Sequence, residues 1–241
     1  MTVWIQKTDN EIADDFIFSA YLGFRHMGKI TKFFSKPEKI HFKEDDIVVG
    51  DLKSSRFIFK KLNITPPNFF IPDELKKYAK RDIWNDTVGN VLSKFRKDRK
   101  PIFLKPINTK EFPAQVITML PLITWVGQTI DPSILCWVSE AIDIISEWRV
   151  FVSNFKIVGC QYYLGDFKKY PNWNIIESAL SDVKWQPKGW TMDFGVTASG
   201  ETILIETNDG YSIGDYGLES VTYATLLKNR FYELTGSKSL I

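Results

Sequence analysis

The chain has 241 residues, of which 44% are hydrophobic, 25% charged and 15% aromatic. This composition is typical of a globular protein with a sizeable core, and it excludes an intrinsically disordered chain. The net charge of +2 is too small, and the basic residues are too evenly mixed with acidic ones, to indicate nucleic-acid binding.

Residues 1–88 predict a small α/β lobe. Its expected elements are strands at 3–5 and 47–50 and helices at 15–22 and 54–62, with Ser54 as the candidate helix cap. Prolines 66 and 67 end the second of these helices, and Pro72 with two acidic residues begins another. The succession of strand, glycine and helix is typical of a partial Rossmann-like lobe; an irregular α/β cap without a binding role of its own is the alternative.

The remaining residues predict two further blocks. The first, residues 89–137, is mostly β, with a helix at about 88–95 and strands at 101–106, 114–119 and 134–138. The second, residues 138–241, contains two hairpins and two helices: strands at 148–152 and 156–163 that turn at Ser153–Asn154, a helix at 173–180, strands from 193 to 208, and a helix at 218–234.

The cysteines, histidines and apolar runs favour a cytoplasmic protein with no membrane segment. Cys136 and Cys160 lie in apolar strands without a CxxC motif, so we expect both to be reduced. His26 and His41 are too few to suggest a zinc site. The N-terminus lacks the pattern of a signal peptide, and the longest apolar run, residues 116–126, is interrupted by a proline and is too short to span a bilayer.

The last hairpin carries the most informative polar residues. Its second strand alternates, so Leu204, Glu206 and Asn208 are expected to share one face. If the hairpin pairs symmetrically about its Ser-Gly turn, Asp193 lies opposite their end of the strand. Two carboxylates and an amide oxygen then converge, which suits Mg²⁺ together with substrate phosphates. The alternative is a polar strand end at the protein surface.

Three cationic residues precede this hairpin. Lys105 ends an apolar strand, where a nucleotide phosphate would pair its ammonium; alternatively, its stem lies on apolar surface and its head reaches water. Lys110 follows five residues later. Arg149 could bind a phosphate or carboxylate with two N–H groups, or form a salt bridge with Glu147 or another acid. The basic run at 94–100 predicts a solvated helix end rather than a nucleic-acid contact.

In this order and spacing, the motifs resemble the ATP-grasp superfamily, and within it the clade named for one arginine and two lysines. The resemblance covers about residues 80–235, and the region of Gly50 and residues 66–78 is similar to the N-terminal lobe of that clade. The motifs that carry it are Phe103-Leu-Lys105-Pro106, Lys110-Glu-Phe112, Ser146-Glu-Trp-Arg149, Asp193-Phe-Gly and Ile205-Glu206-Thr-Asn208-Asp-Gly210-Tyr211.

The resemblance implies an α+β or α/β fold of the ATP-grasp type. An N-terminal lobe (1–88), a small lobe with the phosphate lysines (89–137) and a C-terminal lobe with the metal site (138–241) would together grip ATP. The resemblance further implies that Lys105 and Lys110 bind the ATP phosphates and that the backbone of Val138, Ser139 and Glu140 contacts adenine. It implies catalytic roles for Arg149 and Lys110. It also implies metal binding by Asp193, Glu206 and Asn208, and acceptor binding by Gly210, Tyr211 and Ser212.

The implied reaction is ATP-dependent ligation. ATP phosphorylates a carboxylate, and an amine or thiol then displaces the phosphate, with Mg²⁺ as the metal and Mn²⁺ as an alternative. This chemistry needs charge neutralisation and positioning more than a nucleophilic side chain, which agrees with a chain nearly free of His and Cys. The substrates are open: a peptide, a protein tail, an amino acid or a small metabolite would fit.

Two other classes compete with the ligase. Asp193-Phe-Gly is also the metal-binding triplet of protein kinases, but both histidines precede Lys105, so no HRD-type loop is present. A non-catalytic ATP-binding or interaction protein with the same fold is the second class. One departure from the family concerns the lid, because the stretch after Lys105 lacks the glycines of many ATP-grasp proteins, and Lys110 would compensate by its charge.

Overall fold

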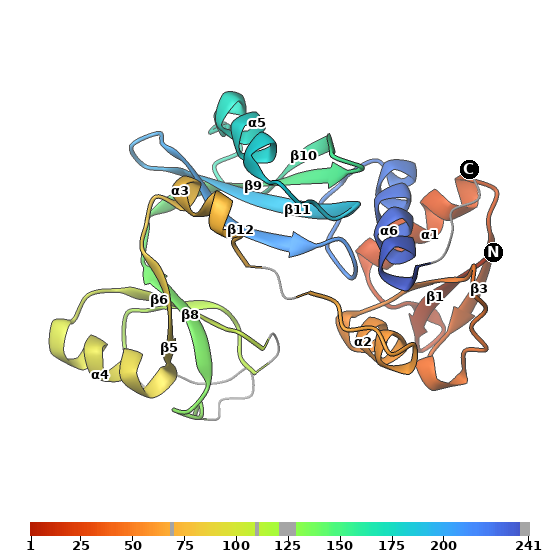
Figure 1. Cartoon of the computed structure of the whole chain (residues 1–241), viewed down its shortest axis with the longest axis horizontal. Coiled ribbons are helices and arrows are strands. Elements are labelled where there is room, and N and C mark those ends of the chain that lie inside the picture. The colour runs from red at the N-terminus through yellow and green to blue at the C-terminus, as the bar shows by residue number, and fades with distance from the viewer. Residues whose placement is uncertain (68–69, 109–110, 121–128, 237–241) are drawn as a thin grey trace. The chain divides into compact units, whose positions relative to one another are not determined.

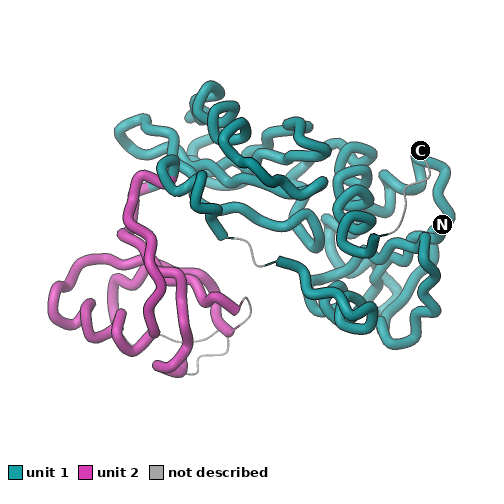
Figure 2. Tube along the Cα trace, in the orientation of Figure 1, with its two compact units in different colours: residues 1–78, 144–241 teal, residues 79–143 magenta. Residues whose placement is uncertain are grey.

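The computed structural model describes residues 1–67, 70–108, 111–120 and 129–236. The chain forms two compact units, coloured separately in Figure 2. Unit 1 combines the two ends of the chain, residues 1–78 and 144–241, and unit 2 consists of residues 79–143. No helix in the described ranges has the length and apolar character that crossing a membrane requires.

Unit 1 begins with a small, mainly parallel sheet (Figure 1). Strand β1 pairs in parallel with β3 and with β4, and its end pairs antiparallel with β2. Apolar residues alternate in β1, and Val3 and Ile5 are fully buried. The elements are β1 (Thr2–Thr8), β2 (Glu11–Ile12), α1 (Asp15–His26), β3 (Ile30–Phe34), η1 (Pro37–Lys39), β4 (Ile47–Val49), α2 (Leu52–Lys61), η2 (Asp73–Leu75) and α3 (Lys76–Ala79).

The second sheet of unit 1 is antiparallel, in the order β10-β9-β11-β12 (Figure 1). It consists of two hairpins that join through β9 and β11. Every residue of β11 is buried, because this central strand is covered on both faces. The elements are β9 (Ile144–Ser153), β10 (Lys156–Gly165), α5 (Trp173–Asp182), β11 (Gly189–Thr197), β12 (Thr202–Asp209) and α6 (Ser220–Thr235).

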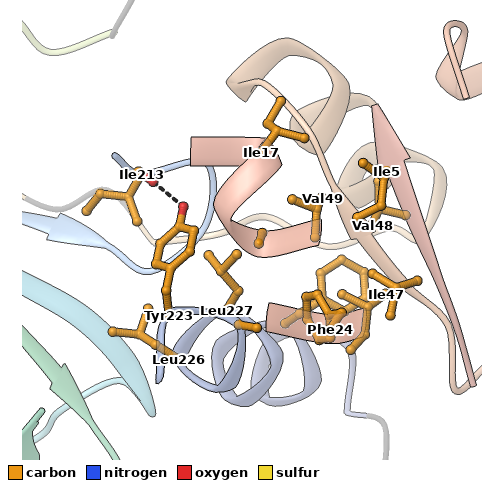
Figure 3. Close-up of a cluster of buried hydrophobic side chains, with 14 of the residues drawn as sticks. Ile5, Ile17, Phe24, Ile47, Val48, Val49, Ile213, Tyr223, Leu226 and Leu227 are labelled. Carbon is orange, nitrogen blue, oxygen red and sulfur yellow. Dashed lines mark hydrogen bonds between the residues drawn. The ribbon is translucent and has the colours of Figure 1, made fainter. Parts of the chain in front are cut away.

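Helix α6 joins the two sheets of unit 1 into one core. It packs against α1, and Gly23 permits the close approach, since an added Cβ would overlap the Ser220 carbonyl oxygen. Figure 3 shows Tyr223 and Leu227 of α6 facing Ile17 and Val49 of the N-terminal elements. The two ends of the chain therefore fold as one body, held together by burial of apolar side chains.

Unit 2 is an antiparallel sheet with one covering helix. The strand order is β5-β8-β6-β7, and Val88, Val91 and Phe95 of the helix supply part of its core. The Thr87 side chain caps the helix by accepting from the Asn90 N–H. The elements are β5 (Ile83–Thr87), α4 (Val88–Asp98), β6 (Ile102–Pro106), β7 (Gln115–Ile117) and β8 (Leu135–Glu140).

The structure contains the predicted strands and helices in their predicted order, adds strands β2, β3 and β5 that were not predicted, and corrects three further details. Helix α2 begins at Leu52, because the Asp51 carboxylate, rather than Ser54, caps it. The β9–β10 turn lies at Asn154 and Phe155, both with positive φ, one residue later than expected. The division into lobes 1–88, 89–137 and 138–241 stays a prediction.

The third correction concerns the last hairpin. A β-bulge lies between the pairs Asp193–Glu206 and Phe194–Leu204, so β12 contains one extra residue there. Leu204 therefore faces the opposite side of the sheet from Glu206, and the prediction that the two share a face is wrong. The bulge itself directs Glu206 to the same face as Asp193.

Candidate functional site

A row of polar side chains crosses the second sheet of unit 1. Asp193 of the central strand β11 pairs with Arg149 of β9 on one side and with Glu206 of β12 on the other. Directly paired residues on neighbouring strands project from the same face, about 5 Å apart. Asn208, two residues beyond Glu206, is on this face as well. The strand register thus assembles four predicted site residues.

Arg149 and Asp193 form a two-point ion pair at the centre of the row. Arg149 Nε donates to Asp193 Oδ1 at 2.8 Å, and Nη2 donates to Oδ2 at 2.7 Å. Arg149 is 7% exposed and Asp193 1% exposed. Burial opposes the charge on the guanidinium, but the hydrogen bonds and charge of Asp193 more than offset this and raise the pKa of Arg149. Arg149 is therefore a fixed, permanent cation.

Asn208 connects the two carboxylates of the row. Its Nδ2 donates to Glu206 Oε1 at 3.0 Å and to Asp193 Oδ2 at 3.3 Å. Glu206 and Asn208 are both half-buried. Rotating the Asn208 amide by half a turn would present its oxygen where its nitrogen now lies. The three side chains can then offer only oxygen atoms toward a cation.

These residues fit a hard divalent cation such as Mg²⁺. Glu147, two residues before Arg149, belongs to the same face, so this face carries three carboxylates and one guanidinium, an excess of two negative charges. Oxygen ligands and a double negative charge suit Mg²⁺, which keeps further positions for water and phosphate oxygens. Among the described residues, no group of three or more His, Cys, Asp or Glu is arranged to hold a metal.

Two tyrosines and a backbone carbonyl complete the surroundings of Arg149. Nη1 donates to the Gly214 carbonyl at 3.3 Å. The guanidinium carbon lies 4.7 Å from the ring centroid of Tyr216 and 5.7 Å from that of Tyr163. The two rings stack on each other with centroids 4.7 Å apart. Sequence reasoning missed these contacts, because no local pattern joins residues 149, 163 and 216.

Tyr163 also positions Glu147. Its hydroxyl donates to Glu147 Oε2 at 2.6 Å. Burial, then the nearby Asp193 charge and the bond to Glu147, raises the pKa of Tyr163, so the phenol stays protonated. Glu147 is thus bound to Tyr163, whereas Arg149 forms its ion pair with Asp193. From the sequence, Arg149 could form a salt bridge with Glu147 or with another acid. The structure shows that its partner is the other acid, Asp193.

The predicted acceptor residues lie in a loop, residues 209–217, that is anchored at its start. Arg230 of α6 binds Asp209 through two N–H groups, at 2.6 and 2.5 Å. Gly210 N donates to the Gly189 carbonyl at 3.1 Å, and an added Cβ on Gly210 would overlap that oxygen. Only glycine fits at position 210, so close packing against Gly189 explains why this residue is a glycine.

Tyr211 and Ser212 connect the loop to the first sheet of unit 1. The Tyr211 ring meets Phe59 of α2 edge-on, with centroids 5.0 Å apart. The Ser212 hydroxyl lies 2.6 Å from Ser55 Oγ and 2.8 Å from the Gly50 carbonyl, to which it donates. The predicted acceptor segment therefore contacts the strand end and helix start of the N-terminal α/β elements.

Unit 2 holds the other predicted ATP contacts. Lys105 is half-buried on β6, where it pairs with Trp137 of β8. Val138 is in the core of the unit, and the Ser139 hydroxyl donates to the Glu140 carbonyl at 3.0 Å. All three predicted adenine contacts are the last residues of strand β8 rather than part of a loop. Lys110 lies outside the described residues.

A groove of about 670 Å³ adjoins the end of β8. Its lining includes Trp84, Lys94, Ile102, Val116, Ser139 and Glu140. The Lys94 ammonium lies 4.7 Å above the Trp84 ring centroid. Unit 2 thus brings Lys105, Val138, Ser139 and Glu140 onto one small sheet, and unit 1 brings together Arg149 and the three predicted metal ligands.

The chain matches a known protein family, and this match defines the class of protein to which the site belongs. Residues 78–226, more than half of the chain, match the model of an ATP-grasp domain, family 2 of the clade named for one arginine and two lysines. The molecule is an ATP-grasp protein, and it belongs to this second family of the clade. Membership confirms the predicted superfamily, clade and fold, and with them the enzyme class, an ATP-grasp ligase. A search of curated proteins found no significant match.

Solved ATP-grasp structures are similar to the whole chain. The ATP-grasp ligase PsnB, in complex with a phosphomimetic variant of its minimal precursor, Mg and ADP, is 12% identical, with 97% of each chain covered and a TM-score of 0.52. D-alanine–D-alanine ligase from Bacillus anthracis is 11% identical, with 97% of this chain and 96% of that chain covered and a TM-score of 0.54. D-cycloserine synthetase DcsG is 9% identical, with 96% and 100% covered and a TM-score of 0.54. At these identities the likeness concerns the fold.

Proposed function

We propose that the protein joins a carboxylate to an amine or thiol, and that it forms an acyl-phosphate while ATP is converted to ADP and phosphate. The observation that carries the proposal is the polar row of unit 1. A buried, permanently charged arginine beside two carboxylates and an amide oxygen suits the transfer of a phosphoryl group.

In the first step, a carboxylate oxygen of the substrate attacks the γ-phosphorus of ATP, and ADP leaves with the electrons of the broken P–O bond. Arg149 would neutralise charge on the transferred phosphoryl group through N–H groups that Asp193 does not use. Lys105 would bind ATP phosphates, and Lys110 is proposed for the same role. The backbone of Val138, Ser139 and Glu140 would contact adenine.

In the second step, the amine or thiol attacks the carbonyl carbon of the acyl-phosphate, the C–O bond to phosphate breaks, and the nucleophile loses its proton. The loop that begins at Gly210, Tyr211 and Ser212 is proposed to bind this acceptor. Asp193, Glu206 and Asn208 would hold the metal, Mg²⁺ or Mn²⁺, which would supply charge neutralisation for the phosphates. The presence of Mg and ADP in the PsnB complex supports the choice of Mg²⁺.

A peptide is the first substrate class to test, because PsnB was captured with a precursor. The test incubates the protein with ATP, Mg²⁺, hydroxylamine and a mixture of amino acids and short peptides. Hydroxylamine traps an acyl-phosphate as a hydroxamate, so we expect hydroxamate, ADP and phosphate in equal amounts. Product identification by mass spectrometry then names the carboxylate.

The matched variants are Glu206→Gln, which removes a proposed metal ligand, and Glu201→Gln, which removes an exposed charge at the turn of the same hairpin. Hydroxamate should be lost in the first variant and retained in the second. If the wild-type protein binds ATP but forms no ADP with any carboxylate, the protein is a nucleotide-binding module rather than a ligase. Phosphate transfer to a hydroxyl-containing substrate would instead indicate a kinase-like enzyme.

A further inference from the structure

The surroundings of Arg149 point to a residue that controls how this arginine is presented. We propose that Tyr216 is a positioning residue for Arg149, and that the loop of residues 209–217 holds Tyr216 against this arginine. The inference rests on the proposed role of Arg149 toward the γ-phosphoryl group. It adds a specific link between the acceptor loop and that arginine.

The contacts of Arg149 restrain its plane from two directions. Asp193 and the Gly214 carbonyl accept hydrogen bonds from three of its N–H groups. The Tyr216 ring covers its face at 4.7 Å, the shorter of its two ring contacts. Guanidinium groups stack favourably on aromatic faces, and the attraction grows as water is excluded. Within the part of the chain that the structure describes, two of the five N–H groups are left for a ligand.

The backbone of the loop is strained at two positions. Ser212 has a φ of 51° and Tyr216 a φ of 46°, in the left-handed region that is unfavourable for a non-glycine residue. Such conformations persist only where the surrounding contacts determine them. At each position the side chain makes a specific contact: Ser212 with Gly50, and Tyr216 with Arg149.

The other contacts of the loop hold these two residues in place. Arg230 binds Asp209 at its start. The Tyr223 hydroxyl of α6 donates to the Ile213 carbonyl, a bond drawn in Figure 3. Because α6 and Gly50 fix the loop, the Tyr216 ring is held against the Arg149 guanidinium. Since Tyr216 is 44% exposed, core packing does not account for its position.

The experiment compares Tyr216→Leu, which removes the ring, with Tyr216→Phe, which keeps it. Tyr170→Leu is the matched control, because Tyr170 is an exposed tyrosine of the same unit that packs on Trp148. The first readout is the ratio of the dissociation constants of Mg·ADP and Mg·AMPPNP, which isolates the contribution of the γ-phosphoryl group. We expect this ratio to fall about fivefold in Tyr216→Leu and to stay within about twofold of wild type in the other two variants.

A second readout needs no nucleotide. The Arg149 Nε–H signal, assigned by its loss in Arg149→Lys, should exchange with solvent faster in Tyr216→Leu than in Tyr216→Phe. An unchanged exchange rate and an unchanged affinity ratio would overturn the positioning role. A wild-type protein that does not bind Mg·AMPPNP would refute the proposed function instead, and the exchange rate would still decide the contact. If Tyr216→Leu does not fold, Tyr216→Gln takes its place in both measurements.

Discussion

Asp193 is expected to serve two purposes, because its carboxylate neutralises Arg149 and belongs to the proposed metal set. Each oxygen already accepts one N–H of the guanidinium. Asn208 also donates to Oδ2, and a half-turn of its amide would direct an oxygen toward a cation instead of an N–H group. Its position between Arg149 and Glu206, at the centre of the row, would allow both uses.

The ion pair predicts a large difference between two carboxylates of the same row. Asp193→Ala leaves the buried Arg149 charge uncompensated, which should lower the free energy of unfolding by about 3–5 kcal/mol. Glu206→Ala removes a half-buried charge and should cost less than about 1 kcal/mol. Urea unfolding without nucleotide measures both. Equal losses in the two variants would contradict the central role of the Arg149–Asp193 pair.

The hairpin of β11 and β12 shows what the sequence can specify at the scale of an element. Its polar residues, turn and strand direction follow from local alternation, and the pairing of Asp193 with Glu206 agrees with a symmetric hairpin. The bulge does not follow from the sequence, because the extra residue is chosen by packing on both faces of the sheet. Leu204 is needed in the core beside Phe194, and Glu206 is needed on the opposite face.

The conformation of loop 209–217 is harder to predict from the sequence than that of the hairpin. Its glycines and tyrosines indicate a turn-rich connection, but its conformation depends on Arg230, Gly50 and Arg149, which are distant in sequence. The ring contacts of Tyr216 and Tyr163 could be found only from the fold. By contrast, Arg149 and the three metal candidates could be named from residue type, because apolar strands rarely carry such groups without a use.

The cap of α6 gives a prediction at the same scale. The Glu219 carboxylate accepts from the N–H groups of Val221 and Thr222, and these bonds lower its pKa. A lowered pKa means that the stabilisation is present above the ordinary glutamate value and is lost as the pH falls through the folded value. Glu219→Gln should therefore lower the Tm by a few degrees at pH 7 and by less near pH 3.

Thermal unfolding at the two pH values measures this effect. Glu177→Gln is the control, since Glu177 is an exposed residue within α5 rather than at a helix end. Its effect should be small at both pH values. If Glu219→Gln lowers the Tm by the same amount at pH 3 and at pH 7, the charge of the Glu219 cap contributes nothing to stability.

At the scale of the whole molecule, unit 1 is built from both ends of the chain. Local periodicity cannot reveal this, because α1 and α6 are about 200 residues apart and meet only in the folded protein. The family model begins at residue 78, where unit 1 gives way to unit 2. The order of motifs along the chain is sufficient to predict the superfamily, since each motif carries its own chemical group.

The central prediction is that Glu206 and Lys105 each contribute to binding Mg·ATP, and calorimetric titration with AMPPNP tests it most directly. With Mg²⁺, Glu206→Gln and Lys105→Ala should each weaken binding at least about tenfold, whereas the exposed-charge controls Glu201→Gln and Lys97→Ala should match wild type. With EDTA in place of Mg²⁺, only Lys105→Ala should still differ from wild type. Wild-type affinity in both Glu206→Gln and Lys105→Ala would contradict the account.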